Sequence, residues 1–383
     1  MRASRPEVTE MRVVLFCHSL ISDWNHGNAH FLRGVVSELV ARGHSVTTYE
    51  PRDGWSLTHL RQEGGTAAIA RFHRAFPTLL PQLVNLETLS LDEALDRADL
   101  VIVHEWMPHE VVERIGRHRV RGGRYTLLFH DTHHRSVTDP AAMARYRLDC
   151  YDGVLAFGEV IRQRYVALGW SRRAWTWHEA ADTRIFGPRP ELRPAHDLVW
   201  IGNWGDDERT QALRSYLFEP VETLRLSATV HGVRYPRAAL EAIDRAGIVY
   251  GGWVPNADTP EVYAHHRMTV HIPRLPYVQA LPGVPTIRVF EALACGIPLV
   301  TTAWRDDEHL FTPGADYLVA DSPAAMTSAL RSLRDDAAMR RELAAHGLAT
   351  IRRRHTCAHR VDELLRLVGE TRPLPRTAMT VPS

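Results

Sequence analysis

The stretch PRLPYVQALPGVPTIRVFEALACG at residues 273–296, followed by the apolar run IPLVT at 297–301, decides the fold of this chain. A loop broken by proline and glycine leads to Thr286, and a helix then carries Arg288 and Glu291. The start of a helix presents unpaired backbone N–H groups and the positive end of a dipole, which together form an anion site. Glu291 lies about a turn and a half further on, where its carboxylate can accept hydrogen bonds from a sugar diol. The pattern therefore predicts a nucleotide site, with a phosphate at the helix start and a ribose beside it.

The segment VFEALACGIPLV resembles the donor-site segment of retaining glycosyltransferases of the GT-B fold, in the family-4-like group called glycosyl transferases group 1. The form TIRVFEALACG is most similar to the spore-maturation, CgeB-like branch of that group. This resemblance implies an α/β protein of two Rossmann-like, doubly wound domains that face each other across a cleft. The alternative interpretation of the apolar positions is a buried helix packed on a parallel strand, with alanine and glycine there for close contact.

Length and composition bound the class of protein. The chain has 383 residues, of which 45% are hydrophobic and 24% charged, and its formal net charge is +1. Two domains are expected at this length, and the charge gives no reason to expect nucleic acid as a partner. No apolar run approaches the roughly 20 residues that span a bilayer, and the polar N-terminus is not typical of a signal peptide. We therefore expect a cytoplasmic protein without a transmembrane segment.

The sequence contains no lysine, so all 46 basic residues are arginine. A P-loop lysine, a Schiff-base lysine and a lysine general base are therefore excluded. Any phosphate must be held by arginine, hydroxyl groups or backbone amides. No convincing Asp-x-Asp metal motif stands at a strand end, and the resemblance implies protein cations and a helix dipole in place of Mg²⁺. We expect neither a metal nor a cofactor.

Strand and helix patterns alternate through both halves of the chain, which predicts parallel, doubly wound sheets. In the first half the predicted strands are residues 11–18, 44–50, 100–103, 125–129 and 153–156, with a helix at 29–42. In the second half they are residues 197–202, 225–231, 248–250, 268–272, 298–301 and 317–319, with helices over most of 322–370.

The domain boundaries follow from these two series and from the passage EAADTRIFGP at 179–188, which resembles the end of the first domain in the family. We expect disordered tails at 1–10 and 372–383, an acceptor domain at 11–185, a linker rich in proline and arginine at 186–196, a nucleotide-sugar domain at 197–354, and a helix at 355–371 that by resemblance returns to the first domain.

The donor site is expected in the second half, at the carboxyl ends of the strands. Arg209 is the candidate for the diphosphate, because a guanidinium binds phosphate oxygens through paired hydrogen bonds. Its alternative role is a solvated helix residue paired with an acidic neighbour. The complete expected donor set is Gly27, Gly202, Asn203, Trp204, Arg209, Trp253, Val254, Gly283, Thr286, Ile287, Arg288 and Glu291.

One position departs from the family pattern. Family-4-like enzymes usually carry a second glutamate eight residues before the ribose-binding one, and this chain has Gly283 there. The ribose role therefore transfers to Glu291 by resemblance, whereas the sugar-contact role has no glutamate to receive it. We expect backbone amides of residues 283–286 to replace that contact.

The acceptor side is expected in the first half, where HDTHHR at 130–135 follows a strand. The resemblance places His130 opposite the donor sugar as the catalytic residue, where an imidazole can donate to a hydroxyl or respond to developing charge. A structural histidine at the strand end is the alternative, and the cluster lacks the spacing of a metal site. The expected acceptor residues are Trp24, Asn25, His26, Glu105, Trp106 and His133.

The resemblance implies transfer of a sugar from a nucleoside diphosphate donor to an unidentified acceptor hydroxyl or amine. It further implies retention of anomeric configuration by front-face attack, without an enzymic nucleophile. Two alternatives stay open: a non-catalytic two-domain protein that binds nucleotide sugars, and a GT-B nucleotide-sugar epimerase. The epimerase needs several acid and base residues that the sequence does not place.

Overall fold

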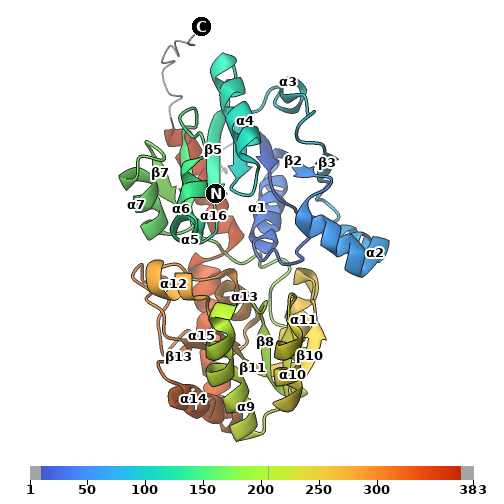
Figure 1. Ribbon diagram of the computed structural model, residues 1–383, viewed down its shortest axis with the longest axis vertical. Helices are drawn as coiled ribbons and strands as arrows, with labels where there is room; N and C mark the ends of the chain where they lie inside the picture. Colours follow the sequence, from blue (N-terminus) through green and yellow to red (C-terminus); the bar gives the residue numbers. More distant parts are fainter. Residues whose placement is uncertain (1–9, 206, 372–383) are drawn as a thin grey trace, which may run out of the picture.

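A computed structural model of the protein describes residues 10–205 and 207–371. The predicted tails, apart from residue 10, lie outside these described residues. Two separate sheets of seven and six strands form the framework, and every strand pair in both is parallel. Helices pack on the two sheets, with the first half of the chain above the second in Figure 1. This arrangement agrees with the predicted class of two doubly wound α/β units.

The first sheet has the strand order β3-β2-β1-β4-β5-β6-β7. Its strands are β1 Arg12–Phe16, β2 Ser45–Pro51, β3 Gln82–Val84, β4 Leu100–His104, β5 Thr126–Asp131, β6 Gly153–Ala156 and β7 Ala174–Thr176. Its helices are α1 Ala29–Ala41, α2 Trp55–Ala75, α3 Leu91–Ala94, α4 His109–Arg121, α5 Arg135–Thr138, α6 Pro140–Ala144 and α7 Glu159–Ala167. The central strands are apolar and buried on both faces, as a parallel sheet covered by helices requires.

The second sheet has the strand order β10-β9-β8-β11-β12-β13. Its strands are β8 His196–Ile201, β9 Ala228–His231, β10 Val249–Gly252, β11 His266–His271, β12 Leu299–Thr302 and β13 Leu318–Ala320. The helices of this half of the chain are α8 Thr210–Leu213, α9 Glu219–Leu224, α10 Arg237–Arg245, α11 Thr259–Ala264, α12 Leu275–Ala280, α13 Ile287–Cys295, α14 Pro323–Asp335, α15 Ala337–Arg354 and, at the end of the chain, α16 Cys357–Glu370. Short 3-10 or π segments cover Asp207–Arg209, Arg214–Phe218 and Asn256–Asp258.

Three details differ from the sequence expectation. The edge strands β3 and β7 have three residues each and were not predicted. Such short strands carry no measurable periodicity. The strand expected from residue 225 begins instead at Ala228, because Arg225 takes the left-handed conformation (φ 53°) that ends α9.

The last helix joins the second half of the chain to the first. Helix α16 packs against α1, and its Arg360 carbonyl accepts a hydrogen bond of 2.9 Å from the indole of Trp177. One apolar cluster includes Phe31 of α1, Phe290 of α13 and Val361 of α16. The two halves therefore share buried core, and Figure 1 shows α16 among the helices of the upper half.

Candidate functional site

A cavity of about 580 Å³ lies between the two halves of the molecule, the first half being the part of the chain that contains β1–β7 and the second half the part that contains β8–β13. Its walls come from the residues that follow β1, β4 and β5 in the first sheet and β8 and β11 in the second. The carboxyl ends of both sheets therefore meet at the cavity, which is where open parallel sheets bind ligands. The lining of the first half is His18, Asn25, His26, Gly27, Asn28, Trp55, Trp106 and His133. The lining of the second half includes Trp200, Gly202, Asn203, Arg209, Arg234, Tyr263, His271, Arg274, Tyr277, Thr286 and Arg288.

Arg209 is a partly buried cation in this wall. Its guanidinium donates to the backbone oxygens of Asn203 and of Ile272 (3.0 Å) and lies 5.3 Å from the ring centroid of Trp200. Its Nε has no partner, and among the described residues no carboxylate lies within ion-pair distance of it. Burial lowers the pKa of Arg209 to about 10. A cation held this way lacks a counter-charge that an anionic ligand can supply.

Two further arginines of the wall are tied to glutamates. Arg274 is paired with Glu208 at 2.5 Å, and Arg288 is paired with Glu291. Glu291 is fully buried and does not belong to the cavity lining, and its other oxygen lies 3.0 Å from Nδ1 of His30. Burial alone raises the pKa of Glu291, but the charge of Arg288 and the hydrogen bond from His30 bring it below its ordinary value. Glu291 thus holds Arg288 from behind the cavity, which differs from the expected contact with a ribose.

Helix α13 begins at the cavity, and its cap residue Thr286 is part of the lining. The Thr286 hydroxyl does not cap the helix and is instead 2.9 Å from Nε2 of His271. Two of the amides expected to touch the donor sugar are already used: the Gly283 N–H donates to the Arg305 carbonyl at 2.6 Å, and the Val284 N–H to that of Leu281. Pro285 has no N–H, which leaves the Thr286 amide for that contact. Gly283 is absent from the cavity lining, whereas Thr286 belongs to it.

His130, the expected catalytic residue, lies in the core and outside the cavity lining. His130 is fully buried and packs against Phe31, Trp177 and His104, with ring centroids 4.9 to 5.9 Å away. Both ring nitrogens lack a partner in the described part of the chain, and burial lowers the pKa of His130 to about 3. The reason is that β5 continues to Asp131, so His130 is a strand residue that faces the core. His133, just past the strand, is the histidine that reaches the cavity.

Several other expected residues lie outside the cavity lining. Trp24 is buried and stacks on His59, Trp204 is buried against Phe218 and Tyr235, and the buried Glu105 accepts from the Thr132 amide at 2.8 Å. Trp253, Val254 and Ile287 are likewise absent from the lining. These aromatic and apolar side chains fill core positions, which local sequence does not distinguish from ligand contacts.

The structure brings ten of the expected residues to the cavity: Gly27, Gly202, Asn203, Arg209, Thr286, Arg288, Asn25, His26, Trp106 and His133. Gly27 also lets the two halves approach, since a Cβ there would lie 3.2 Å from a methyl group of Ile287. Sequence reasoning missed His18, Trp55 and His271, for which no local pattern pointed to a site. It also missed Arg274, although this arginine stands inside the quoted stretch at 273–296.

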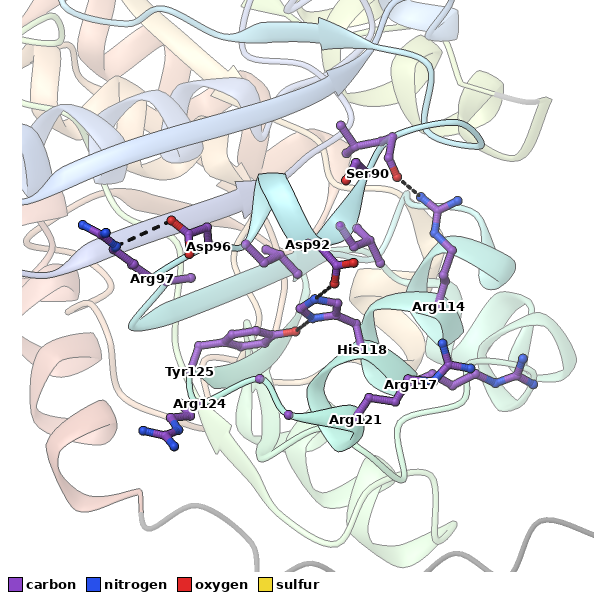
Figure 2. A pocket seen from close by; sticks show the side chains of 16 residues that line it. Ser90, Asp92, Asp96, Arg97, Arg114, Arg117, His118, Arg121, Arg124 and Tyr125 are labelled. Atoms are coloured by element: carbon purple, nitrogen blue, oxygen red, sulfur yellow. Dashed lines mark hydrogen bonds and ion pairs between the residues drawn. The ribbon is translucent and has the colours of Figure 1, made fainter.

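A second cavity, of about 700 Å³, lies between α3 and the C-terminal end of α4. Figure 2 shows Arg114, Arg117, Arg121 and Arg124 around it, with His118 between Asp92 and Tyr125 at 3.1 and 2.9 Å. Tyr125 directly precedes β5, so this basic cavity lies at the amino ends of the strands, opposite the cavity between the halves. Arg121 lies in the last turn of α4, where a basic side chain interacts favourably with the helix dipole. Arg114 donates to the backbone oxygens of Leu86, Glu87 and Leu89, so these two arginines have structural roles without a ligand.

Neither a metal-binding cluster nor a membrane-spanning helix is found in the part of the chain that the structure describes. Within residues 10–205 and 207–371, no group of three or more histidine, cysteine, aspartate or glutamate side chains is placed to hold a metal ion. In the same residues no helix has both the length and the apolar character needed to cross a bilayer.

The second half of the chain matches a known protein family. Residues 209–366 match the family model described as Glycosyl transferase-like. The match begins at Arg209 and includes Thr286, Arg288 and Glu291. Comparison with the curated proteins gave no match.

Solved structures of GT-B glycosyltransferases share the fold over nearly the whole chain. Sucrose-phosphate synthase from Thermosynechococcus elongatus is 12% identical, with 94% of this chain and 99% of that chain covered and a TM-score of 0.63. The Anabaena protein Alr3699/HepE in complex with UDP-glucose is 12% identical, with 94% and 100% covered and a TM-score of 0.68. An alpha-glucosyltransferase in complex with UDP-glucose and DNA containing an abasic site is 11% identical, with 94% and 100% covered and a TM-score of 0.67. The predicted fold of two Rossmann-like domains is confirmed; the CgeB-like branch stays a prediction.

Proposed function

We propose that the protein is a glycosyltransferase that transfers a sugar from a nucleoside diphosphate donor to an acceptor hydroxyl or amine in the cavity between its two halves. The observation that carries this proposal is that Arg209 lines the cavity and has no carboxylate partner among the described residues. A diphosphate compensates such a cation, and the start of α13 at Thr286 adds backbone dipole to the same wall. UDP is the first nucleotide to test, because Alr3699/HepE and the alpha-glucosyltransferase, which are structurally similar to this chain, form complexes with UDP-glucose.

The proposed reaction is retaining and independent of metal. The bond between the anomeric carbon and the donor phosphate oxygen breaks, and its electron pair stays on the diphosphate. The acceptor oxygen attacks from the same face, and its proton passes to the departing diphosphate oxygen. Arg209 and Arg288 stabilise the charge that develops on this leaving group, the part that a metal ion plays in other enzymes. No enzymic nucleophile takes part.

A non-catalytic nucleotide-sugar-binding protein is the second candidate. It is favoured by Gly283, which replaces the family's sugar-contacting glutamate and whose N–H is already bonded to Arg305. An epimerase is disfavoured, because the described lining residues include no aspartate or glutamate to serve as acid and base. Release of UDP from UDP-glucose in the presence of acceptor separates the enzyme from the binding protein.

The binding half of the proposal is tested by calorimetric titration with UDP. Arg209→Met removes charged hydrogen bonds to phosphate and is expected to weaken binding by roughly 10- to 150-fold, from ~1.5–3 kcal/mol. Arg121→Met in the basic cavity of Figure 2 is the matched control and should bind UDP like the parent. Because Arg209 also holds two backbone carbonyls, the thermal midpoint of each variant is measured first. If Arg209→Met and Arg121→Met lose UDP affinity to the same extent, the nucleotide does not bind at Arg209.

A further inference from the structure

The two walls of the cavity differ in charge, and this difference bears on the acceptor, given the function proposed above. All four arginines of the lining, Arg209, Arg234, Arg274 and Arg288, come from the second half of the chain. The described lining residues of the first half include no arginine, aspartate or glutamate. The wall opposite the proposed diphosphate site is therefore built from neutral side chains.

The histidines of the first-half wall are uncharged at neutral pH. Burial lowers the pKa of His18 to about 4 and holds those of His26 and His133 well below their ordinary value. A neutral imidazole has one nitrogen that donates and one that accepts. His26 Nε2 and His133 Nδ1 have no partner in the described residues. Both atoms are buried and lack a partner, so each leaves a neutral hydrogen-bonding requirement that a hydroxyl group can meet.

Two tryptophans of the same wall are unusually exposed. Trp55 is 44% and Trp106 39% exposed, although most large apolar side chains of the chain are buried. Both rings are held by neighbours: Trp55 packs edge-on against Trp24 at 5.1 Å, and Trp106 has the Arg135 guanidinium 4.8 Å from its centroid. Rigid aromatic surface beside neutral hydrogen-bonding groups suits a ligand with an apolar ring face and polar edges.

We propose that the acceptor is a neutral carbohydrate, whose ring packs on Trp106 and Trp55 while its hydroxyls bond to His26 and His133. A sugar ring has C–H faces that stack on indole and hydroxyls at its edge. A phosphorylated or carboxylated acceptor meets no arginine among the lining residues of this wall, because Arg135 lies beside Trp106 outside the lining and 3.9 Å from Glu105. Leaving such a charge uncompensated in a partly buried cavity is costly. A flat phenol fits the tryptophans but leaves the imidazoles and the Asn25 amide without hydroxyl partners.

The test measures transfer from UDP-glucose to matched acceptors: glucose, maltose and cellobiose against glucose 6-phosphate, glucuronate and a simple phenol. The expected result is product with the neutral sugars at a kcat/KM at least tenfold above that with the charged sugars or the phenol. A higher kcat/KM with a charged sugar or the phenol overturns the inference. Binding of UDP-glucose without transfer to any neutral sugar overturns it as well. If UDP-glucose and UDP fail to bind, the proposed function itself fails, so the two failures are distinguishable.

Variants of Trp106 test the wall directly. Trp106→Leu keeps an apolar side chain but loses the aromatic face, and it should raise the KM for maltose about tenfold while the Kd for UDP changes less than twofold. Trp106→Phe keeps an aromatic face and should recover most of that loss. If Trp106→Leu weakens UDP binding as much as it raises the KM for maltose, or leaves both unchanged, the acceptor does not lie on this wall.

Discussion

Replacing Glu291 by alanine should chiefly destabilise the protein, although the sequence assigns this residue to donor binding. Glu291 is fully buried, and both of its oxygens are bonded, one to Arg288 and one to His30 at 3.0 Å. The Nε2 atom of His30 accepts the Asp182 amide at 2.8 Å, so the proton of the neutral ring is on Nδ1 and is donated to Glu291. The alanine variant therefore loses two hydrogen bonds and leaves a guanidinium without its counter-charge.

The magnitude follows from the burial of the three groups. Breaking a buried ion pair by removing one partner costs ~3–5 kcal/mol. Arg288 keeps 27% of its side chain exposed, so water recovers part of that loss and we take ~2–3 kcal/mol. In an α/β unit of this size the loss corresponds to a fall of roughly 4–12 °C in the thermal midpoint.

The assay is thermal unfolding followed by circular dichroism, with calorimetric titration of UDP on the same samples. Glu241→Ala is the matched control, because Glu241 pairs with Arg237 on the surface of α10 and should cost less than about 1 kcal/mol. If Glu291→Ala unfolds within about 1 °C of the parent and yet binds UDP tenfold more weakly, Glu291 binds the donor as the sequence predicts. Its contacts with Arg288 and His30 then contribute little to stability.

The other predictions concern His130 and metal ions. Burial lowers the pKa of His130 from 6.5 to about 3, so between these values the unfolded chain takes up a proton that the folded chain does not. Stability therefore falls as the pH drops below 6.5, with His130 contributing ~2 kcal/mol of that loss at pH 5. His130→Phe should flatten the dependence of the urea midpoint on pH and keep turnover within a few-fold; an unchanged slope or a hundredfold loss of kcat would restore the catalytic assignment. Turnover should also survive EDTA, because arginines stand at the proposed diphosphate site; loss on chelation that Mn²⁺ or Mg²⁺ restores would contradict this.

The fold was predictable because its signals are local and repeated. Valine-rich runs such as that of β1 identify strands buried on both faces, and their alternation with helices leaves few topologies. The edge strands β3 and β7 escaped because three residues carry no period. Arg209 could be named from the sequence because it follows the first strand of the second half, at the edge of the sheet where open parallel sheets bind ligands.

Other site residues depend on contacts that the sequence does not show. The position of His130 was not visible from the sequence, because β5 runs two residues past the predicted end, which turns this side chain into the core and leaves His133 at the cavity. The contact of Glu291 with His30 could not be read from the sequence, because the two residues are 261 positions apart in the chain. Trp55 could not be recognised as a cavity residue from the sequence. Its position in the wall is visible only once the second half of the chain is placed opposite the start of α2.

In the proposed reaction, a nucleoside diphosphate sugar bound on the second-half wall gives its sugar to an acceptor on the first-half wall. The most direct measurement mixes the full chain with UDP-glucose and maltose, quantifies released UDP, and identifies the glycosylated product and its anomeric configuration by mass spectrometry and NMR. We predict one product molecule per UDP released and retention of the anomeric configuration. The rate of transfer should fall at least tenfold in Arg209→Met but not in Arg121→Met. UDP-glucose that binds to the parent but yields neither UDP nor product would contradict the proposed reaction.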